Sequence, residues 1–307
     1  MKQLHTPQLT PKWLAQAYEW ETKQVEGYLP SHLPILEHLP SQYFEVSIAF
    51  SEQDIFSNRQ YPQYFTIQSI SKFFSLFYVL KQCGVNKVRQ KVGITASSIA
   101  YNTKSATAFY VNGAILNPFI NAGALTITSM IDGHSIIEKV RNIQLFIAQQ
   151  FNVVTTIDEN VLSYERQHSE RNKEILHTLN KLDLLEDAIE NTLETYLTLC
   201  SLQMSTQDLA KIGYKFQQLI THDAIARYAH RALLASGLYG ESPLAVNNQQ
   251  IAAKSGISGS IFSYKLSSCN QYPTFDKIGI GIYSPLLNNE GNSVKGIHFL
   301  KQLFSQI

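Results

Sequence analysis

Residues 65–80 read FTIQSISKFFSLFYVL and contain the only S-x-x-K of the chain, formed by Ser69 and Lys72. From Ile70 onward the segment is apolar on almost every side, which predicts a helix buried at the centre of the protein. A lysine three residues after a serine lies one turn away on the same helix face. The sequence therefore predicts a serine and a lysine together at the start of a buried helix.

Ser69 and Lys72 have the chemistry of an activated nucleophile. Burial disfavours the ammonium form and lowers the pKa of a lysine, so Lys72 can act as a base near neutral pH. The unpaired backbone N–H groups at a helix N-terminus suit a developing oxyanion. The alternative is that Ser69 caps the helix and Lys72 faces solvent, because serine is a favoured N-cap residue.

A second short motif, AKSG at residues 253–256, stands beside a predicted strand near the C-terminus. Serine acyl-transferases of the penicillin-binding class combine S-x-x-K with a later K-[TS]-G on an edge strand. The two motifs occur here in that order. The S-D-N element of that set is absent from the sequence, which argues against ordinary β-lactamase chemistry.

A third stretch, NPFINAGA at residues 117–124, indicates a sharp turn that enters a helix. Asparagine side chains there can bind an amide or a carboxylate. The residues alone leave open the alternative that they only form the turn and cap the helix.

The pattern along the chain predicts an α/β (α+β) fold. Strands are expected at residues 43–50, 260–266 and 277–283, with a weaker one at 53–58. Helical periodicity covers residues 10–27, most of 67–235 (including 135–151, 175–202 and 208–219) and 293–304. Because a lone hairpin is marginal, the strands of both ends should share one mostly antiparallel sheet flanked by helices. We expect a single domain over residues 1–307, with sheet-bearing parts at 1–68 and 236–307 around an inserted helical subdomain at 69–235.

The composition indicates a chain with a large buried core. Of 307 residues, 44% are hydrophobic and 16% are charged, whereas roughly 25% are charged in typical soluble proteins. A disordered chain has few hydrophobic residues and a high net charge, so this composition excludes disorder. The net charge of +1 gives no field for nucleic acid or a membrane surface, so neither partner is expected. The cysteines, Cys83, Cys200 and Cys269, are scattered, and neither a zinc spacing nor a signal-peptide pattern is present. We expect a cytoplasmic protein without a metal.

Six blocks in order resemble the serine-dependent glutaminase family, which shares the fold of β-lactamases and D,D-peptidases. The likeness extends from about Val25 to the C-terminus. The blocks are residues 65–72, 117–124, 171–172, 196–200, 253–256 and 291–299.

The resemblance implies hydrolysis of L-glutamine to L-glutamate and ammonia through an acyl-serine intermediate, without an organic cofactor. It makes Ser69 the nucleophile, Lys72 its base, and the N–H groups of Ser69 and Ile257 the oxyanion hole. It also places Tyr28 and Tyr239 in the catalytic pocket. The residues matched to substrate binding are Ser69, Asn121, Glu165, Asn172, Tyr196, Tyr239 and Ile257.

These assignments fit a free amino acid, whose ammonium needs an anionic acceptor such as Glu165 and whose carboxylate needs amide or hydroxyl donors. From the residues alone, Glu165 is as well explained as a solvated carboxylate and Tyr196 as a core tyrosine. Departures from the family pattern are Gly240, where aspartate is usual, and Ser258 and Ser260 in place of glycines.

Two other functions stay open at this point. One is a D,D-peptidase or β-lactamase-like serine hydrolase, and the other is a non-catalytic glutamine-binding sensor. The resemblance further implies a homo-oligomer, a dimer or a tetramer.

Overall fold

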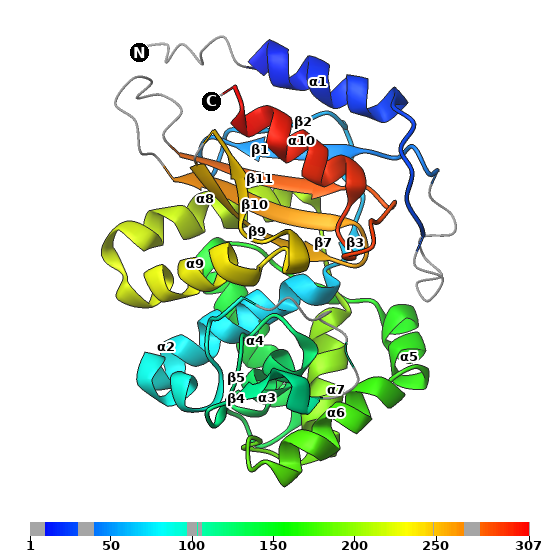
Figure 1. The fold of residues 1–307 in the computed structure, drawn as a ribbon. Helices are drawn as coiled ribbons and strands as arrows, with labels where there is room; N and C mark the ends of the chain where they lie inside the picture. Colours follow the sequence, from blue (N-terminus) through cyan, green and yellow to red (C-terminus); the bar gives the residue numbers. More distant parts are fainter. Residues whose placement is uncertain are drawn as a thin grey trace.

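The computed structural model describes residues 10–29, 40–96, 103, 106–247, 249–266 and 277–306. Figure 1 shows a sheet-bearing part above a helical part. The helices are α1 (Thr10–Thr22), α2 (Ser71–Lys91), α3 (Asn121–Ser129), α4 (Ile136–Phe151), α5 (Glu159–Gln167), α6 (Glu170–Lys181), α7 (Ile189–Cys200), α8 (Thr206–His222), α9 (Ala224–Ser236) and α10 (Val294–Phe304), with 3-10 turns η2 (Gln68–Ile70), η3 (Ala106–Phe109) and η4 (Tyr239–Glu241).

The main sheet joins strands from both ends of the chain, as the sequence predicts. Its order is β2-β1-β11-β10-β9-β8, and every neighbouring pair is antiparallel. Ile48 of β1 lies opposite Ile280 of β11. The strands are β1 (Glu45–Ala49), β2 (Ile55–Ser57), β8 (Leu244–Val246), β9 (Gln249–Gly256), β10 (Ser260–Leu266) and β11 (Lys277–Tyr283).

Helices cover both faces of this sheet (Figure 1). On one face, α1 and α10 enclose an apolar core that includes Trp13, Phe44, Ile280 and Phe299. On the other face, α8 packs against β1, β10 and β11, and α9 packs against β9. This second layer continues into the larger core of the helical part.

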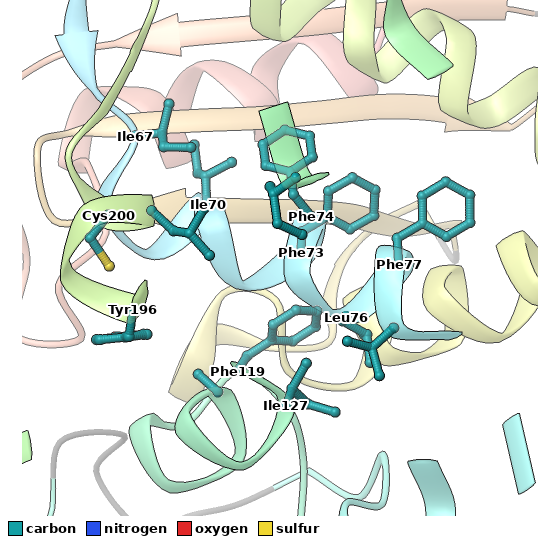
Figure 2. Packing of buried hydrophobic residues seen from close by; sticks show 14 of the residues in the cluster. Ile67, Ile70, Phe73, Phe74, Leu76, Phe77, Phe119, Ile127, Tyr196 and Cys200 are labelled. Carbon is teal, nitrogen blue, oxygen red and sulfur yellow. The ribbon is translucent and has the colours of Figure 1, made fainter. Parts of the chain in front are cut away.

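Helix α2 lies at the centre of that larger core. The ring centre of Phe73 lies 4.8 Å from that of Phe216 in α8, which it contacts edge-on, and 4.9 Å from that of Phe262 in β10. Figure 2 shows Phe73, Phe74 and Phe77 along this helix. The predicted buried helix is confirmed, although the backbone leaves helical conformation at Gly84 (φ 82°, ψ 162°) and a kink follows.

The helical part differs from the sequence prediction in two ways. Residues 175–202 are not one helical stretch, because α6 and α7 are separated at 182–188, where Asp183 has a left-handed φ of 56°. Short strands also occur within this region and, at residues 65–66, just before it, and their two or three residues are too few to show alternation. They are β3 (Phe65–Thr66), β4 (Tyr110–Val111), β5 (Ala114–Ile115), β6 (Thr156–Ile157) and β7 (Leu202–Met204).

Close packing of α8 on β11 depends on Gly281. A Cβ atom at this position would overlap the Thr206 carbonyl oxygen and approach Ala210 N. We expect Gly281→Ala to lower the free energy of unfolding by about 3 kcal/mol through overpacking, measured by urea denaturation. In the control Gly113→Ala, the new methyl group meets no described atom within 4 Å, and only the positive φ costs about 1 kcal/mol. Equal losses would contradict the packing argument.

Candidate active site

Ser69 lies in the 3-10 turn η2, directly before α2. The N-cap positions of η2 and α2 are Ile67 and Ile70, so Ser69 caps neither helix. The preceding residue, Gln68, adopts a left-handed φ of 47°. Such strain in a non-glycine residue persists only where the surroundings enforce it, and it is frequent at active sites. Because Ile67 and Ile70 hold the N-cap positions, the explanation of Ser69 as a helix cap is wrong.

Lys72 is buried, which contradicts the alternative of a solvent-facing side chain. Its Nζ donates to the Phe119 carbonyl oxygen at 3.0 Å and to Asn121 Oδ1 at 2.8 Å. The amide of Asn121 in turn donates to Asn172 Oδ1 at 3.1 Å. Burial lowers the pKa of Lys72 to about 7, so a large share of this amine is neutral at physiological pH.

The turn at residues 117–120 sets the direction of Phe119 and Asn121. Asn117 Oδ1 accepts hydrogen bonds from the N–H groups of Phe119 and Ile120, and α3 begins at Asn121. The predicted sharp turn into a helix is confirmed. It presents one carbonyl and one amide oxygen to Lys72.

Strand β9 ends beside the residues that lead into the η2 turn. A Cβ atom at Gly256 would approach the Ile67 carbonyl oxygen at 2.5 Å and Ser260 Oγ at 2.7 Å, so only glycine permits this closeness. The backbone after Gly256 carries Ile257, which lines the same cavity as Ser69.

Lys254, in the same strand, is a second fully buried lysine. Its Nζ donates to the Ser255 carbonyl oxygen at 2.7 Å and lies 4.2 Å from the ring centre of Tyr239, while Lys72 Nζ lies 5.8 Å from that centre. Burial, followed by the charge of Lys72, holds the pKa of Lys254 well below its usual value. The K-S-G motif marks Lys254 in the sequence, but only the structure places it near Lys72.

A cavity of about 260 Å³ opens beside Ser69. This is smaller than the roughly 300–1,000 Å³ of pockets for drug-sized ligands, so it suits a molecule the size of an amino acid. Six residues predicted from the sequence line it, from five helices or turns and the β9–β10 turn. They are Ser69, Asn121, Glu165, Asn172, Tyr196 and Ile257.

Sequence reasoning did not assign the other lining residues, which are Gln68, Tyr164, His168, Arg171 and Cys200. Tyr164 and His168 are one helical turn apart and flank Glu165, so helical spacing was the available signal. Their rings stack with centres 3.9 Å apart. Arg171 is the neighbour of Asn172.

Glu165 is only partly exposed, which argues against the explanation of it as a solvated carboxylate. Its Oε1 is buried and has no hydrogen-bond partner among the described residues. Burial raises the pKa of this carboxyl, while Gln68 and the charge of His168 act in the opposite direction. A buried, incompletely paired carboxylate is costly unless a cation joins it.

Tyr196 is both a core residue and a wall of the cavity. Figure 2 shows Tyr196 and Cys200 projecting from α7 near the start of α2. Burial raises the pKa of Tyr196 well above its usual value, so its hydroxyl stays neutral and can donate a hydrogen bond.

Tyr28 and Tyr239 do not line this cavity in the described part of the chain. Tyr239 is buried under the two lysines, whereas Tyr28 is 45% exposed and exchanges backbone hydrogen bonds with Leu287. Their assignment to the pocket stays a prediction.

Within the described ranges, no group of three histidine, cysteine or acidic residues is arranged to hold a metal. In the same part of the chain, none of the helices has the length and hydropathy to cross a membrane. Cys83 and Cys200 are free thiols, and Cys269 lies outside the described residues.

A buried serine, a lysine with a lowered pKa and a small polar cavity are together typical of serine hydrolases that work through an acyl-enzyme. The family model described as Glutaminase matches residues 27–307. The chain therefore belongs to the glutaminase family, whose β-lactamase-like fold agrees with the antiparallel sheet and its flanking helices.

Similar proteins agree with this family. Glutaminase 2 of Bacillus subtilis is 31% identical over 287 residues, which are 90% of this chain and 91% of that protein. The crystal structure of a probable glutaminase from Bacillus subtilis has a TM-score of 0.81 at 26% identity, over 98% of this chain and 97% of that one. A further structure, of a probable Bacillus subtilis glutaminase complexed with 6-diazo-5-oxo-L-norleucine, has a TM-score of 0.80 at 26% identity, covering 100% and 98% of the two chains.

Proposed function

We propose that this chain is an amidohydrolase that converts L-glutamine to L-glutamate and ammonia through an acyl-serine intermediate. The observation that carries the proposal is the small cavity lined by both Ser69 and Glu165, whose Oε1 is buried and has no hydrogen-bond partner among the described residues. The complex of a similar protein with 6-diazo-5-oxo-L-norleucine supports an amino-acid ligand of this size. The direct test is ammonia release by the purified chain at millimolar glutamine, and no release would contradict the proposal.

In the proposed reaction, neutral Lys72 takes the hydroxyl proton of Ser69 as Oγ attacks the carbon of the glutamine side-chain amide. A neutral amine has two N–H bonds and a lone pair. Phe119 O and Asn121 Oδ1 accept hydrogen bonds from the Lys72 nitrogen, and its lone pair is proposed to take the proton. The N–H groups of Ser69 and Ile257 are proposed to stabilise the tetrahedral oxyanion.

Collapse of that intermediate breaks the C–N bond, and the proton held by Lys72 passes to the leaving nitrogen, which departs as ammonia. Water then attacks the acyl-serine and gives its proton to Lys72. Glutamate is released when the C–O bond to Ser69 breaks and Oγ takes back the proton held by Lys72. Atoms balance as glutamine plus water gives glutamate plus ammonia.

Substrate recognition is proposed to use both charged groups of the free amino acid. Glu165 pairs with the ammonium, and the amide and hydroxyl donors of Asn121, Asn172 and Tyr196 serve the carboxylate. Tyr28 and Tyr239 are proposed to complete the pocket.

Glu165→Gln is expected to lower kcat/KM for glutamine by about 100-fold, mainly through KM, because the substrate ammonium loses its buried partner. Initial rates of ammonia release at varied glutamine concentration give both constants. Glu174→Gln, an exposed glutamate on α6, is the matched control and should match the wild type. Unchanged KM in Glu165→Gln would contradict the assignment.

Binding of glutamine and labelling with a penicillin, measured beside ammonia release, separate the two alternatives. Tight glutamine binding without hydrolysis would favour a sensor, and a stable acyl adduct with a penicillin would favour a D,D-peptidase-like enzyme.

We also propose a homo-oligomer (a dimer or a tetramer), a cytoplasmic location and a single functional domain over residues 1–307. The family resemblance supports the oligomer, and the free thiols Cys83 and Cys200 support a reducing compartment. Light scattering after size-exclusion chromatography measures the oligomer directly.

A further inference from the structure

The loop at residues 287–293 contacts three segments that carry candidate site residues. Leu287 and Tyr28 exchange backbone hydrogen bonds, Leu287 O accepting at 3.0 Å and Leu287 N donating at 2.9 Å. The remainder of the loop reaches η4, which carries Tyr239, and β9, which carries Lys254. The loop residues do not belong to the lining of the described cavity.

Asn292 is the centre of these contacts and is fully buried. Its Oδ1 accepts from Ser255 Oγ at 2.5 Å. Its Nδ2 donates to the Leu238 carbonyl oxygen at 3.0 Å and to Glu241 Oε2 at 2.6 Å. Ser255 follows Lys254 in β9, while Leu238 and Glu241 lie on either side of Tyr239. One side-chain amide therefore links the lysine strand to the tyrosine turn.

The turn needs such support because Tyr239 holds a left-handed φ of 54°. A conformation of this kind costs of order 1–3 kcal/mol and persists only where neighbouring groups hold it. Gly240 N donates to Glu290 Oε2 at 3.2 Å, and the Glu290 carboxylate occupies the space of a side chain at position 240. Asn288 Nδ2 adds a bond to the same Glu241 oxygen that Asn292 contacts, at 3.0 Å.

The position of Tyr239 matters because both buried lysines lie over its ring, at 4.2 Å for Lys254 Nζ and 5.8 Å for Lys72 Nζ. A shift of this ring changes the surroundings of the amine that serves as the base. Water entering the space would favour the ammonium form of Lys72.

We infer that Asn292 is a positioning residue for the reaction: its amide joins Ser255 to the 238–241 turn and so fixes Tyr239 over Lys254 and Lys72. This inference rests on the proposed glutaminase function. It assigns no contact between Asn292 and the substrate.

The test is a double-mutant cycle with Asn292→Asp and Glu241→Gln in the full chain. Asn292→Asp removes both N–H donors and sets a carboxylate against Glu241, so kcat should fall at least about ten-fold with KM within about two-fold. The acid limb of the kcat profile should also move to higher pH. In the double variant, the amide at position 241 can donate to the carboxylate at 292. It should recover kcat to within about three-fold of Glu241→Gln, with the acid limb restored.

Two further variants keep the test decisive. Asn180→Asp, at an exposed position on α6, is the matched control and should behave as wild type. Ser255→Ala removes only the link to β9 and should lower kcat about five-fold, which gives a result even if Asn292→Asp fails to fold. A melting temperature lowered in Asn292→Asp with kcat and the acid limb unchanged, or additive effects in the cycle, would overturn the inference. Wild-type protein without ammonia release would instead overturn the proposed function.

Discussion

Ser69→Ala is expected to abolish ammonia release from glutamine, lowering kcat by about 10⁴-fold or more. The reason is that the hydroxyl oxygen of Ser69 forms the acyl bond in the proposed reaction. Only one oxygen atom is lost at a site that helps to line the cavity. Glutamine binding, followed by calorimetry, should therefore survive in this variant.

Ser75→Ala is the matched control for this experiment. Ser75 is also buried on the same helical segment but lies outside the described cavity lining. It should keep activity within about two-fold of wild type. Circular dichroism and melting temperature check that both variants fold. Residual activity above about 1% in Ser69→Ala would mean that another group is the nucleophile.

Lys72→Met should have an effect of similar size, a loss of about 10³-fold or more in kcat, because methionine fills the buried space without providing a base. The pH profile of the wild-type enzyme should show the titration of Lys72. Burial lowers the pKa of Lys72 from its usual value to about 7, and only the neutral amine accepts the serine proton. The value of kcat/KM should therefore rise about ten-fold per pH unit below pH 7 and level off above it.

The position of this acid limb, near pH 7, reports the lowered pKa of the lysine base, and substitution of Lys72 assigns it. An ordinary lysine would stay protonated until far above pH 7 and give no plateau near neutrality. Lys72→Arg, which keeps a permanent cation, should be as inactive as Lys72→Met. Lys173→Met, on the exposed face of α6, is the control and should retain the wild-type profile. An acid limb that persists unchanged in Lys72→Arg would assign the titration to another group.

Much of the fold could be predicted because local pattern reports burial. Aromatic and β-branched residues identified β1, β-like runs between glycines identified β10 and β11, and continuous apolar character identified α2 as a central helix. The short strands β3, β6 and β7 were missed because two or three residues carry no period. The break between α6 and α7 was missed because residues 182–188 remain rich in leucine and so continue the apolar spacing.

The candidate site, like the fold, could be predicted from the sequence only in part. The spacing within one helix places Lys72 one turn after Ser69, so the sequence by itself identified this pair. The cavity beside this pair depends on α3, α5, α6 and α7, which supply its walls. The lowered pKa of Lys72 depends on burial by the surrounding structure.

The family resemblance brought Asn121, Glu165, Asn172, Tyr196 and Ile257 to the same site as Ser69, but only the tertiary structure placed Lys254 and Asn292 beside Tyr239. Lys254, Tyr239 and Asn292 lie far from Ser69 along the chain, yet they meet through β9, η4 and the 287–293 loop. Sequence alone determined most of the helical regions, the strands β1, β2, β10 and β11 and the Ser69–Lys72 pair, because those follow from local composition and spacing, whereas β8 and β9 were not predicted. Charge coupling and hydrogen bonding across the core depend on which buried surfaces meet, and local periodicity shows that a face is buried without showing its partner.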